Sequence, residues 1–170
     1  RSFYFILTPN QRTSAFDLHI NETKMHMFIP ILSRKRILTK YVFLSNIRVW
    51  KSNDAGTTFN PIFDKYCQSI GAIEVDPNDP DNIVYVGTGE TWPRNSVSIG
   101  DGLYKSIDGG NSWNKIGFEN SERIANIIVN PKNSDEIIVG VLGALWSDSK
   151  ERGVYKSDDG GISWNKILYV

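Results

Sequence analysis

The chain has 170 residues, and because protein domains average about 150 residues, this length predicts a single domain. Its 19 Lys and Arg residues balance 19 Asp and Glu residues, so no basic surplus exists for a phosphate backbone, and we expect no nucleic-acid partner. One cysteine and two histidines argue against an internal disulfide and a metal site. No apolar run approaches the length of about 20 residues that a membrane span needs.

Residues 1–46 differ from the rest of the chain in charge. Up to Arg48 there are eight basic and two acidic residues, and the basic ones include the run Arg34-Lys-Arg36. The segment contains no copy of the repeat found in the rest of the chain. Two interpretations stay open for this atypical basic segment. It is either a stretch that is not native to the fold or a divergent repeat unit with a strand at Tyr41–Leu44.

A repeated motif first appears in residues 47–64, which we expect to form the third and fourth strands of a unit. Ser52-Asn-Asp-Ala-Gly-Thr-Thr-Phe59 fits the pattern Ser-x-Asp-x-Gly-x-x-(Trp/Phe). The same pattern returns at Ser106–Trp113 and at Ser157–Trp164, with starts at positions 52, 106 and 157. Similar segments at a near-constant period predict a tandem array of one structural unit.

Two complete units follow, at residues 69–118 and 122–170. In the first we expect strands at 70–75, 83–88, 102–106 and 112–117, and in the second at 124–129, 136–142, 153–157 and 163–169. These runs are rich in Ile, Val and Tyr and are bounded by Pro, Asn, Asp and Gly, which is typical of a β-meander. Four-stranded units of about 50 residues form propeller blades. The predicted fold class is therefore all-β: a partial β-propeller of about two complete blades plus part of a third.

The residues of the motif suit a hairpin better than they suit catalysis. Asp108 and Asp159 can accept hydrogen bonds from backbone N–H groups of a turn, and Gly110 suits a positive φ. Trp113 and Trp164 are large enough to pack into the sheets. We therefore interpret the motif as structural. Its residues are Ser52, Asp54, Gly56 and Phe59, then Ser106, Asp108, Gly110 and Trp113, then Ser157, Asp159, Gly161 and Trp164.

The motif is the Asp box, also called the bacterial neuraminidase repeat. With the flanking segments 84–90, 100–106 and 151–157, the chain resembles the Asp-box propellers of the glycosyl hydrolase and sortilin N-terminal-like family, over about residues 47–170. Those proteins are related in fold to xyloglucan-degrading glycosidases. The resemblance implies a scaffold that binds a carbohydrate or peptide ligand, with the remaining blades of a longer parent chain as partners. The alternative that it implies is a glycoside hydrolase acting on a polysaccharide. It favours a secreted, periplasmic or extracellular location.

Long connections between the second and third strands place residues 89–101 and 143–152 on the rim opposite the Asp boxes. Function in rigid scaffolds usually lies on such loops. Trp92 and Trp146 can stack on sugars or peptide side chains, and the other ligand-binding candidates are polar: Glu90, Arg94, Asp101, Asp148, Glu151 and Arg152. Alternatively, the tryptophans cover the blade ends and Arg152 pairs with a neighbouring acid.

The sequence assigns no catalytic residue. Glycoside hydrolysis needs two carboxylates on either side of the scissile bond, and Glu90 stands where the xyloglucan-degrading enzymes carry an Asp-Gly-Gly sequence. The chain contains no glycine-rich phosphate loop, so we expect no cofactor. Because propellers close with four to eight blades, we also expect this chain to be a fragment of a longer propeller.

Overall fold

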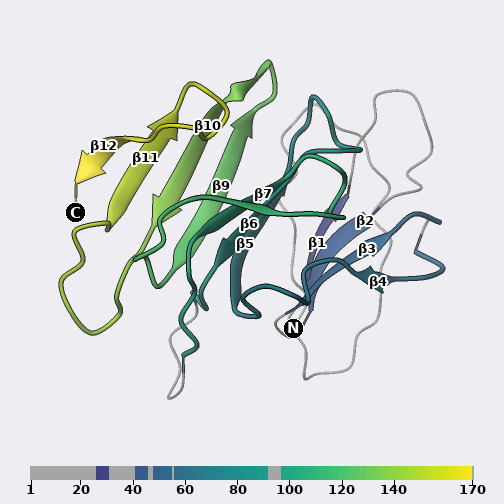
Figure 1. Ribbon diagram of the computed structural model, residues 1–170, viewed down its shortest axis with the longest axis horizontal. Coiled ribbons are helices and arrows are strands. Elements are labelled where there is room, and N and C mark those ends of the chain that lie inside the picture. The colour runs from purple at the N-terminus through teal and green to yellow at the C-terminus, as the bar shows by residue number, and fades with distance from the viewer. Residues whose placement is uncertain (1–25, 31–40, 46–47, 55, 92–96, 170) are drawn as a thin grey trace, which may run out of the picture.

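The computed structural model describes residues 26–30, 41–45, 48–54, 56–91 and 97–169 (Figure 1). In these ranges it contains twelve strands and no helix. The strands are β1 His26–Pro30, β2 Tyr41–Ser45, β3 Arg48–Ser52, β4 Asn60–Pro61, β5 Ile70–Val75, β6 Val84–Thr88, β7 Leu103–Ser106, β8 Asn114–Gly117, β9 Ile124–Asn130, β10 Asn133–Val141, β11 Gly153–Ser157 and β12 Asn165–Tyr169. The all-β class predicted from the sequence is confirmed.

The strands form three antiparallel sheets of four strands each: the first sheet (β1–β4), the second sheet (β5–β8) and the third sheet (β9–β12). Each sheet is a meander in which neighbours in sequence are neighbours in space. The register repeats as well, because Ile73 pairs with Val86 in the second sheet and the equivalent Ile127 pairs with Val139 in the third. This arrangement is a series of consecutive propeller blades.

The fourth strand of each complete blade begins later than the sequence predicted. In the second sheet β8 starts at Asn114 and not at Ser112, and in the third sheet β12 starts at Asn165 and not at Ser163. The cause is the Asp box, because the N–H of Ser112 bonds to the carboxylate of Asp108 at 2.8 Å instead of joining a strand ladder. The hairpin is therefore longer than the alternation of apolar residues suggests.

Two apolar clusters lie between the sheets and hold them together. Because successive side chains of a strand point to opposite faces, the second sheet contributes to both clusters. Between the first and second sheets lie Val49, Phe63, Ile73, Val75, Val84, Val86, Tyr104 and Trp113. Between the second and third sheets lie Ala72, Tyr85, Leu103, Ile124, Ile127, Val129, Ile137, Val139 and Val141.

The burial of the strands follows from this packing. Every residue of β6 in the second sheet is buried, as expected for a sheet covered on both faces. In β10 of the third sheet, Ile137, Val139 and Val141 are buried while Ile138 between them is exposed. The third sheet is thus covered by described residues on one face.

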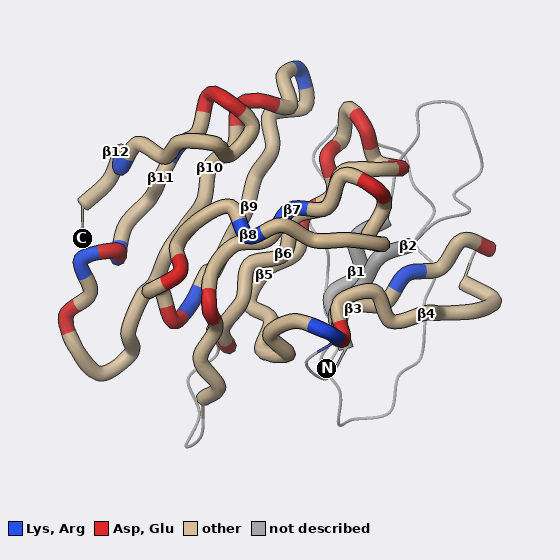
Figure 2. The backbone as a smooth tube through the Cα atoms, in the orientation of Figure 1, with Lys and Arg blue, Asp and Glu red and all other residues tan. Residues whose placement is uncertain are grey.

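The connections divide between two rims (Figure 1). The hairpin rim carries the turns β5–β6, β7–β8, β9–β10 and β11–β12. Backbone bonds from Gly109 to Asn82 and from Gly160 to Asp135 join neighbouring turns on this rim. Acidic residues lie at both ends of the strands, on this rim and at the opposite end (Figure 2). The loop rim, at the other end of the strands, carries the two long connections at residues 89–101 and 143–152.

Candidate functional site

The Asp-box hairpin at Ser106–Trp113 is closed by side chains. Ser106 Oγ donates to Asp108 Oδ1 at 2.8 Å and accepts the N–H of Gly110 at 2.8 Å. The Asp108 carboxylate also accepts the N–H of Ser112 at 2.8 Å and its hydroxyl at 2.6 Å. Gly110 has a φ of 93°, in the region that favours glycine. The hydrogen bonds therefore use both carboxylate oxygens within the turn.

The same hydrogen bonds recur in the hairpins of Asp54 and Asp159, where the serine Oγ again lies 2.8 Å from the carboxylate. In all three, donation by the hydroxyl four residues further on is the largest cause that lowers the pKa of the carboxyl, to about 2. A group with that pKa is ionised at neutral pH and cannot serve as a proton donor to substrate. The geometry supports a structural role for the Asp boxes.

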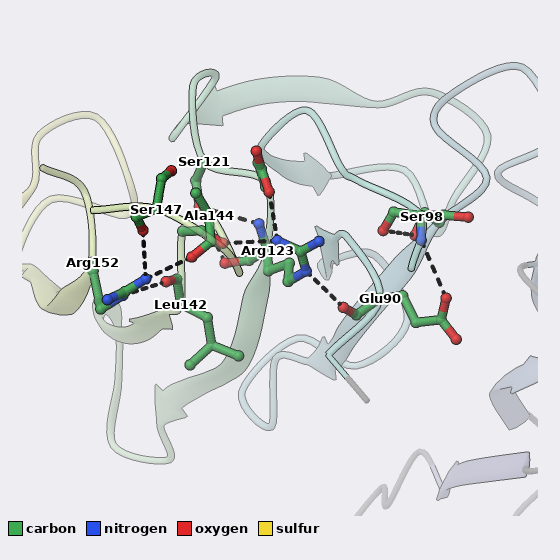
Figure 3. Close-up of polar contacts among 11 residues, drawn as sticks. Glu90, Ser98, Ser121, Arg123, Leu142, Ala144, Ser147 and Arg152 are labelled. Carbon is green, nitrogen blue, oxygen red and sulfur yellow. Dashed lines mark hydrogen bonds and ion pairs between the residues drawn. The ribbon is translucent and has the colours of Figure 1, made fainter. Parts of the chain in front are cut away.

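On the loop rim, Arg123 lies where the two long loops meet (Figure 3). Its side chain is buried, with 3% of the residue exposed. Its Nε donates to the carbonyl of Glu90 at 3.1 Å, in the first loop, and its Nη1 donates to the carbonyl of Gly143 at 3.2 Å, in the second. Nη1 also pairs with the Glu122 carboxylate at 2.6 Å. Arg123 thus fixes the two loops relative to each other.

Arg152 fixes the second loop internally (Figure 3). Its Nε donates to the Leu142 carbonyl at 2.9 Å, and its Nη2 donates to the carbonyls of Ala144 at 2.6 Å and Ser147 at 3.1 Å. These bonds are to backbone carbonyls, whereas one sequence interpretation paired Arg152 with a neighbouring acid. Because two of the accepting carbonyls flank residues 145 and 146, the guanidinium holds the tip of the loop in one shape.

Asp101 ends the first long loop inside a network of donors. Its carboxylate accepts from the hydroxyl of Tyr104 at 2.6 Å, from Nζ of Lys115 at 3.1 Å and from the hydroxyl of Thr88 at 3.3 Å. Burial opposes ionisation of Asp101, but these hydrogen bonds outweigh it and lower the pKa of the carboxyl. The structure therefore uses Asp101 to anchor the end of the loop.

The two glutamates of the loops are placed differently. Glu90 accepts the N–H of Ser98 on its carboxylate at 3.3 Å, and a backbone bond at 2.9 Å joins the same two residues. Glu90 therefore closes the base of the first loop. Glu151 has a buried Oε2 with no hydrogen-bond partner among the described residues.

Trp146 and Asp148 project from the tip of the second loop. Trp146 is 86% exposed, so it does not cover the end of a blade as one sequence interpretation required. Asp148 is exposed beside it. Trp92 and Arg94, the candidates of the first loop, lie outside the described residues. Of the eight candidates, six thus lie among the described residues. The two loops that carry them are joined by the Arg123 guanidinium, which bonds to a backbone carbonyl in each loop.

Among the residues that the structure describes, no three His, Cys, Asp or Glu side chains are grouped so that they can hold a metal ion. The described ranges also contain no helix that is long and apolar enough to cross a membrane.

Residues 47–169 match the family model Sortilin-Vps10, described as sortilin, neurotensin receptor 3. The chain belongs to the Sortilin-Vps10 family. No curated protein sequence matches it.

Solved structures with a similar fold include GH74 enzymes. An ancestral GH74 enzyme superposes with a TM-score of 0.63 at 23% identity, over 85% of this chain and 18% of that one. The GH74 xyloglucanase from Xanthomonas campestris gives 0.61 at 15% identity, over 77% and 19%. The Niastella koreensis GH74 enzyme gives 0.51 at 24% identity, over 76% and 19%. At these identities the likeness shows the fold, a partial β-propeller. The chain spans less than a fifth of each of these structures.

Sequence reasoning missed the residues that shape the loop rim of this Sortilin-Vps10 chain, above all Arg123. One signal was present. At the equivalent position of the preceding unit stands Ser69, whose hydroxyl donates to the Ser98 carbonyl at 3.0 Å. Both units therefore have a side-chain donor to a loop carbonyl at this position, a short serine in one and a long arginine in the other. Aligning the two units would have indicated Arg123 as a residue that contacts the loops.

Proposed function

We propose that this chain is part of a ligand-binding propeller whose loop rim binds carbohydrate or peptide. The observation that carries the proposal is the exposure of Trp146, at 86%, on a loop that Arg152 holds through three carbonyls. A solvated indole contributes little to the core, yet the loop beneath it is fixed by these bonds. Such an arrangement suits a recognition surface, because a rigid aromatic side chain loses little conformational entropy when it stacks on a ligand.

The chemistry of the tip fits both ligand classes. The indole face of Trp146 can stack on the apolar face of a sugar ring or on a peptide side chain, and the Asp148 carboxylate can accept hydrogen bonds from hydroxyl or amide groups. Arg123 and Arg152 act in this proposal as positioning residues, since their guanidinium groups already bond to the backbone. The proposal keeps Trp92, Arg94 and Glu90 as further ligand-binding candidates from the first loop.

Isothermal titration calorimetry tests the proposal with two probes, xyloglucan oligosaccharides and a mixed synthetic peptide library. We expect one class to bind and Trp146→Ala to weaken its binding by about 10-fold or more, which corresponds to about 1.4 kcal/mol. Ile162→Ala is the matched control, because Ile162 is equally exposed, at 88%, but lies on the hairpin rim. The proposal would be contradicted if Trp146→Ala, Ile162→Ala and the parent chain bound with equal affinity, or if neither the oligosaccharides nor the peptides bound.

Glycoside hydrolysis is the alternative proposal, and the likeness to GH74 propellers is the observation that favours it. Two carboxylates about 5–9.5 Å apart would have to meet across the scissile bond. In this alternative the loop rim of the chain supplies at most one side, and the other comes from outside residues 1–170. An assay for reducing sugar released from xyloglucan separates the two functions. We expect binding without release, and release by this chain would favour the hydrolase.

We further propose that residues 47–64 end one blade and that residues 69–118 and 122–170 are the two next blades. The four-stranded order of the first sheet supports the divergent-blade interpretation for the segment before residue 47. Membership of the Sortilin-Vps10 family supports a secreted or extracellular location. Detection of the full-length protein in the culture medium of expressing cells would test that location.

A further inference from the structure

The two interfaces between neighbouring sheets differ in polarity near the hairpin rim. At the first interface, between the first and second sheets, the second sheet is lined by apolar side chains such as Val75 and Val84. At the second interface, between the second and third sheets, the alternate residues of the same segments are Glu74, Asp76 and Tyr85. Successive side chains of a strand point to opposite faces, and Tyr85 packs in the cluster between the second and third sheets. Two carboxyl groups therefore face the second interface.

Two buried oxygen atoms of this group have no hydrogen-bond partner among the described residues. Asp76 is 0% exposed, and its Oδ1 accepts the N–H of Asn78 at 2.8 Å while its Oδ2 accepts nothing. The hydroxyl oxygen of Tyr85, a residue that is also 0% exposed, is the other atom. A buried carboxylate oxygen without a donor is strongly unfavourable, so we expect a donor close to Asp76 Oδ2.

Glu74 is placed to be that donor. It lies directly opposite Tyr85 in the register of β5 and β6, and it precedes Asp76 by two residues on the same face. The strand ladder continues to Asp76, whose N–H donates to the Ile83 carbonyl at 3.0 Å, so the Cα atoms of the two acids are about 7 Å apart. Two carboxyl side chains can bridge that distance. A carboxyl group donates only when it is protonated, and two ionised carboxylates would repel each other.

The lysine on this face is too far away to neutralise Glu74. Lys105, in β7, lies opposite Tyr85 on its other side, and its Nζ is 5.4 Å from the centroid of the Tyr85 ring. The same Nζ donates to the carbonyl of Gly160, in the Asp box of the third sheet, at 2.9 Å. Glu74 and Lys105 are thus two strand spacings apart, about 9–10 Å, with the tyrosine between them.

The third sheet adds a negative charge to the second interface. Burial, followed by the charges of Asp76 and of Asp135 in β10, raises the pKa of Tyr85. Burial, with a smaller contribution from Asp76, raises the pKa of Glu74 to about 7. Among the described residues, the titratable and charged groups around Glu74 are therefore Asp76, Tyr85 and Lys105 on the second sheet and Asp135 on the third. Together with burial, the negative charges favour a proton on Glu74.

We propose that Glu74 and Asp76 share one proton and that this proton makes the second interface a pH-sensitive contact. With the proton in place, the O–H of Glu74 donates to Asp76 Oδ2, and the pair carries one negative charge. When the proton leaves to solvent, two carboxylates lie side by side at the interface, and the hairpin ends of the second and third sheets separate to admit water. The equivalents of Glu74 and Tyr85 in the third sheet are Ile128 and Ile138, so the third sheet does not repeat this pair.

The direction of the pH effect follows from the two states of Glu74. In the closed interface the carboxyl group keeps its proton up to about pH 7, whereas in water it loses the proton near its ordinary pKa of 4.5. The closed interface is therefore fully favoured below about pH 4.5, and this advantage is lost as the pH rises through about 7. Opening should increase over this range and level off above it.

Hydrogen exchange of two indole N–H groups tests the proposal in the full chain. Trp164 donates to the Ile116 carbonyl at 2.9 Å and reports on the second interface. Trp113 donates to the Ile62 carbonyl at 2.8 Å and reports on the first interface. The ratio of the two exchange rates, measured by NMR, removes the pH dependence of the exchange chemistry itself. We expect the rate of Trp164 relative to that of Trp113 to rise at least about 10-fold between about pH 5 and about pH 8. A constant ratio would overturn the proposal.

Two variants separate a shared proton from burial alone. Glu74→Gln keeps an N–H donor for Asp76 Oδ2 at every pH, so we expect its exchange ratio to vary by less than about 2-fold over the same range. Glu119→Gln, at an exposed position, is the matched control and should keep the response of the parent chain. Asp76→Asn replaces the shared proton by an amide donor, so the midpoint of the Glu74 titration, followed by the NMR resonance of its carboxyl carbon, should fall by at least about one pH unit. An unchanged midpoint in Asp76→Asn, or a parent-like pH response in Glu74→Gln, would overturn the proposal.

Discussion

The two rims of this propeller segment solve the same problem, the closure of connections between strands, in opposite ways. On the hairpin rim three Asp boxes reproduce one set of hydrogen bonds, with the serine Oγ 2.8 Å from the carboxylate in each. On the loop rim two arginines hold two loops of different length and sequence through backbone carbonyls. Arg123 bonds to one carbonyl in each loop, whereas the three carbonyl bonds of Arg152 all lie in or next to the second loop.

The difference shows where variation is tolerated in a repeat protein. A carboxylate that closes its own turn needs a fixed spacing, so the hairpin sequence is constrained at the Ser, Asp and Gly positions of the motif. A guanidinium that bonds to carbonyls accepts any side chains on the loop it holds, because carbonyls are present at every residue. The loop rim can therefore change its exposed residues without losing its support, and that freedom suits the recognition that we propose for this rim.

The largest effect should come from the hairpin rim. Trp113 is buried against Phe63, with ring centroids 5.0 Å apart, and its indole N–H reaches the Ile62 carbonyl. We expect Trp113→Ala to lower the free energy of unfolding by about 3–5 kcal/mol, through lost burial and a cavity between the sheets. Urea denaturation measures this. Trp113→Phe keeps most of the ring and isolates the hydrogen bond, with an expected loss of about 1–2 kcal/mol.

Removal of Arg123 tests the loop rim at its most buried support. We expect Arg123→Met to cost about 2–4 kcal/mol, because the carbonyls of Glu90 and Gly143 and the Glu122 carboxylate lose their donor. Arg152→Met is the matched variant on the more exposed loop tip, where water can replace the guanidinium, and about 1 kcal/mol is expected. Equal losses in thermal melts of the two variants would show that the loops are not joined through Arg123.

Glu74, in β5, is a second carboxyl group near the hairpin rim, and its pKa is shifted in the opposite direction to that of the Asp-box carboxyl Asp108. Burial, with a smaller contribution from the negative charge of Asp76, raises the pKa of Glu74 to about 7, in contrast to the lowered pKa of Asp108. The folded state therefore binds the proton of Glu74 more tightly than the unfolded state does. Its contribution to stability is complete below about pH 4.5 and is lost as the pH rises through about 7.

The matching variant is Glu74→Gln. At about 1.4 kcal/mol per pKa unit, we expect it to be more stable than the parent by about 2–3 kcal/mol at pH 8 and to lose this part of the pH dependence. Urea denaturation at pH 4, 6 and 8 measures the effect. Glu119→Gln, at an exposed position, controls for the change in net charge. If the free energies of unfolding of the parent and Glu74→Gln changed with pH in parallel, the raised pKa of Glu74 would be contradicted.

Trp146 should give the smallest change in stability. Its side chain is 86% exposed, so Trp146→Ala should alter the free energy of unfolding by less than about 0.5 kcal/mol. Compared with Trp113→Ala, this separates a tryptophan that holds two sheets together from one that is presented to solvent. A loss above about 2 kcal/mol in the same urea experiment, as large as a core substitution gives, would mean that Trp146 packs against the loop.

Much of this architecture could be predicted from the sequence because the same pattern of residues occurs in each repeat unit. Agreement between segments one repeat apart indicated the sheets, and the chemistry of Asp and Gly indicated the hairpins. The start of β8 was predicted too early, because apolar alternation cannot show that a carboxylate competes for the N–H of Ser112. Arg123 and the exposure of Trp146 depend on how two loops meet in space, and no local pattern contains that information.

The indole N–H groups of Trp113 and Trp164 each donate to a backbone carbonyl of the preceding part of the chain, Ile62 and Ile116 respectively, and the position of these rings between sheets has a consequence for spectroscopy. Trp113 lies between the first and second sheets and Trp164 between the second and third, whereas Trp146 lies in solvent, so the first two rings have less polar surroundings than the third. Emission from Trp113 and Trp164 should shift to longer wavelength when the corresponding pair of sheets separates, while emission from Trp146 stays constant. In proteins whose repeats contact only their neighbours, sheets can separate one at a time. This propeller segment therefore contains a natural fluorophore at each of these two joints, so variants that keep only Trp113 or only Trp164 would report which joint opens first.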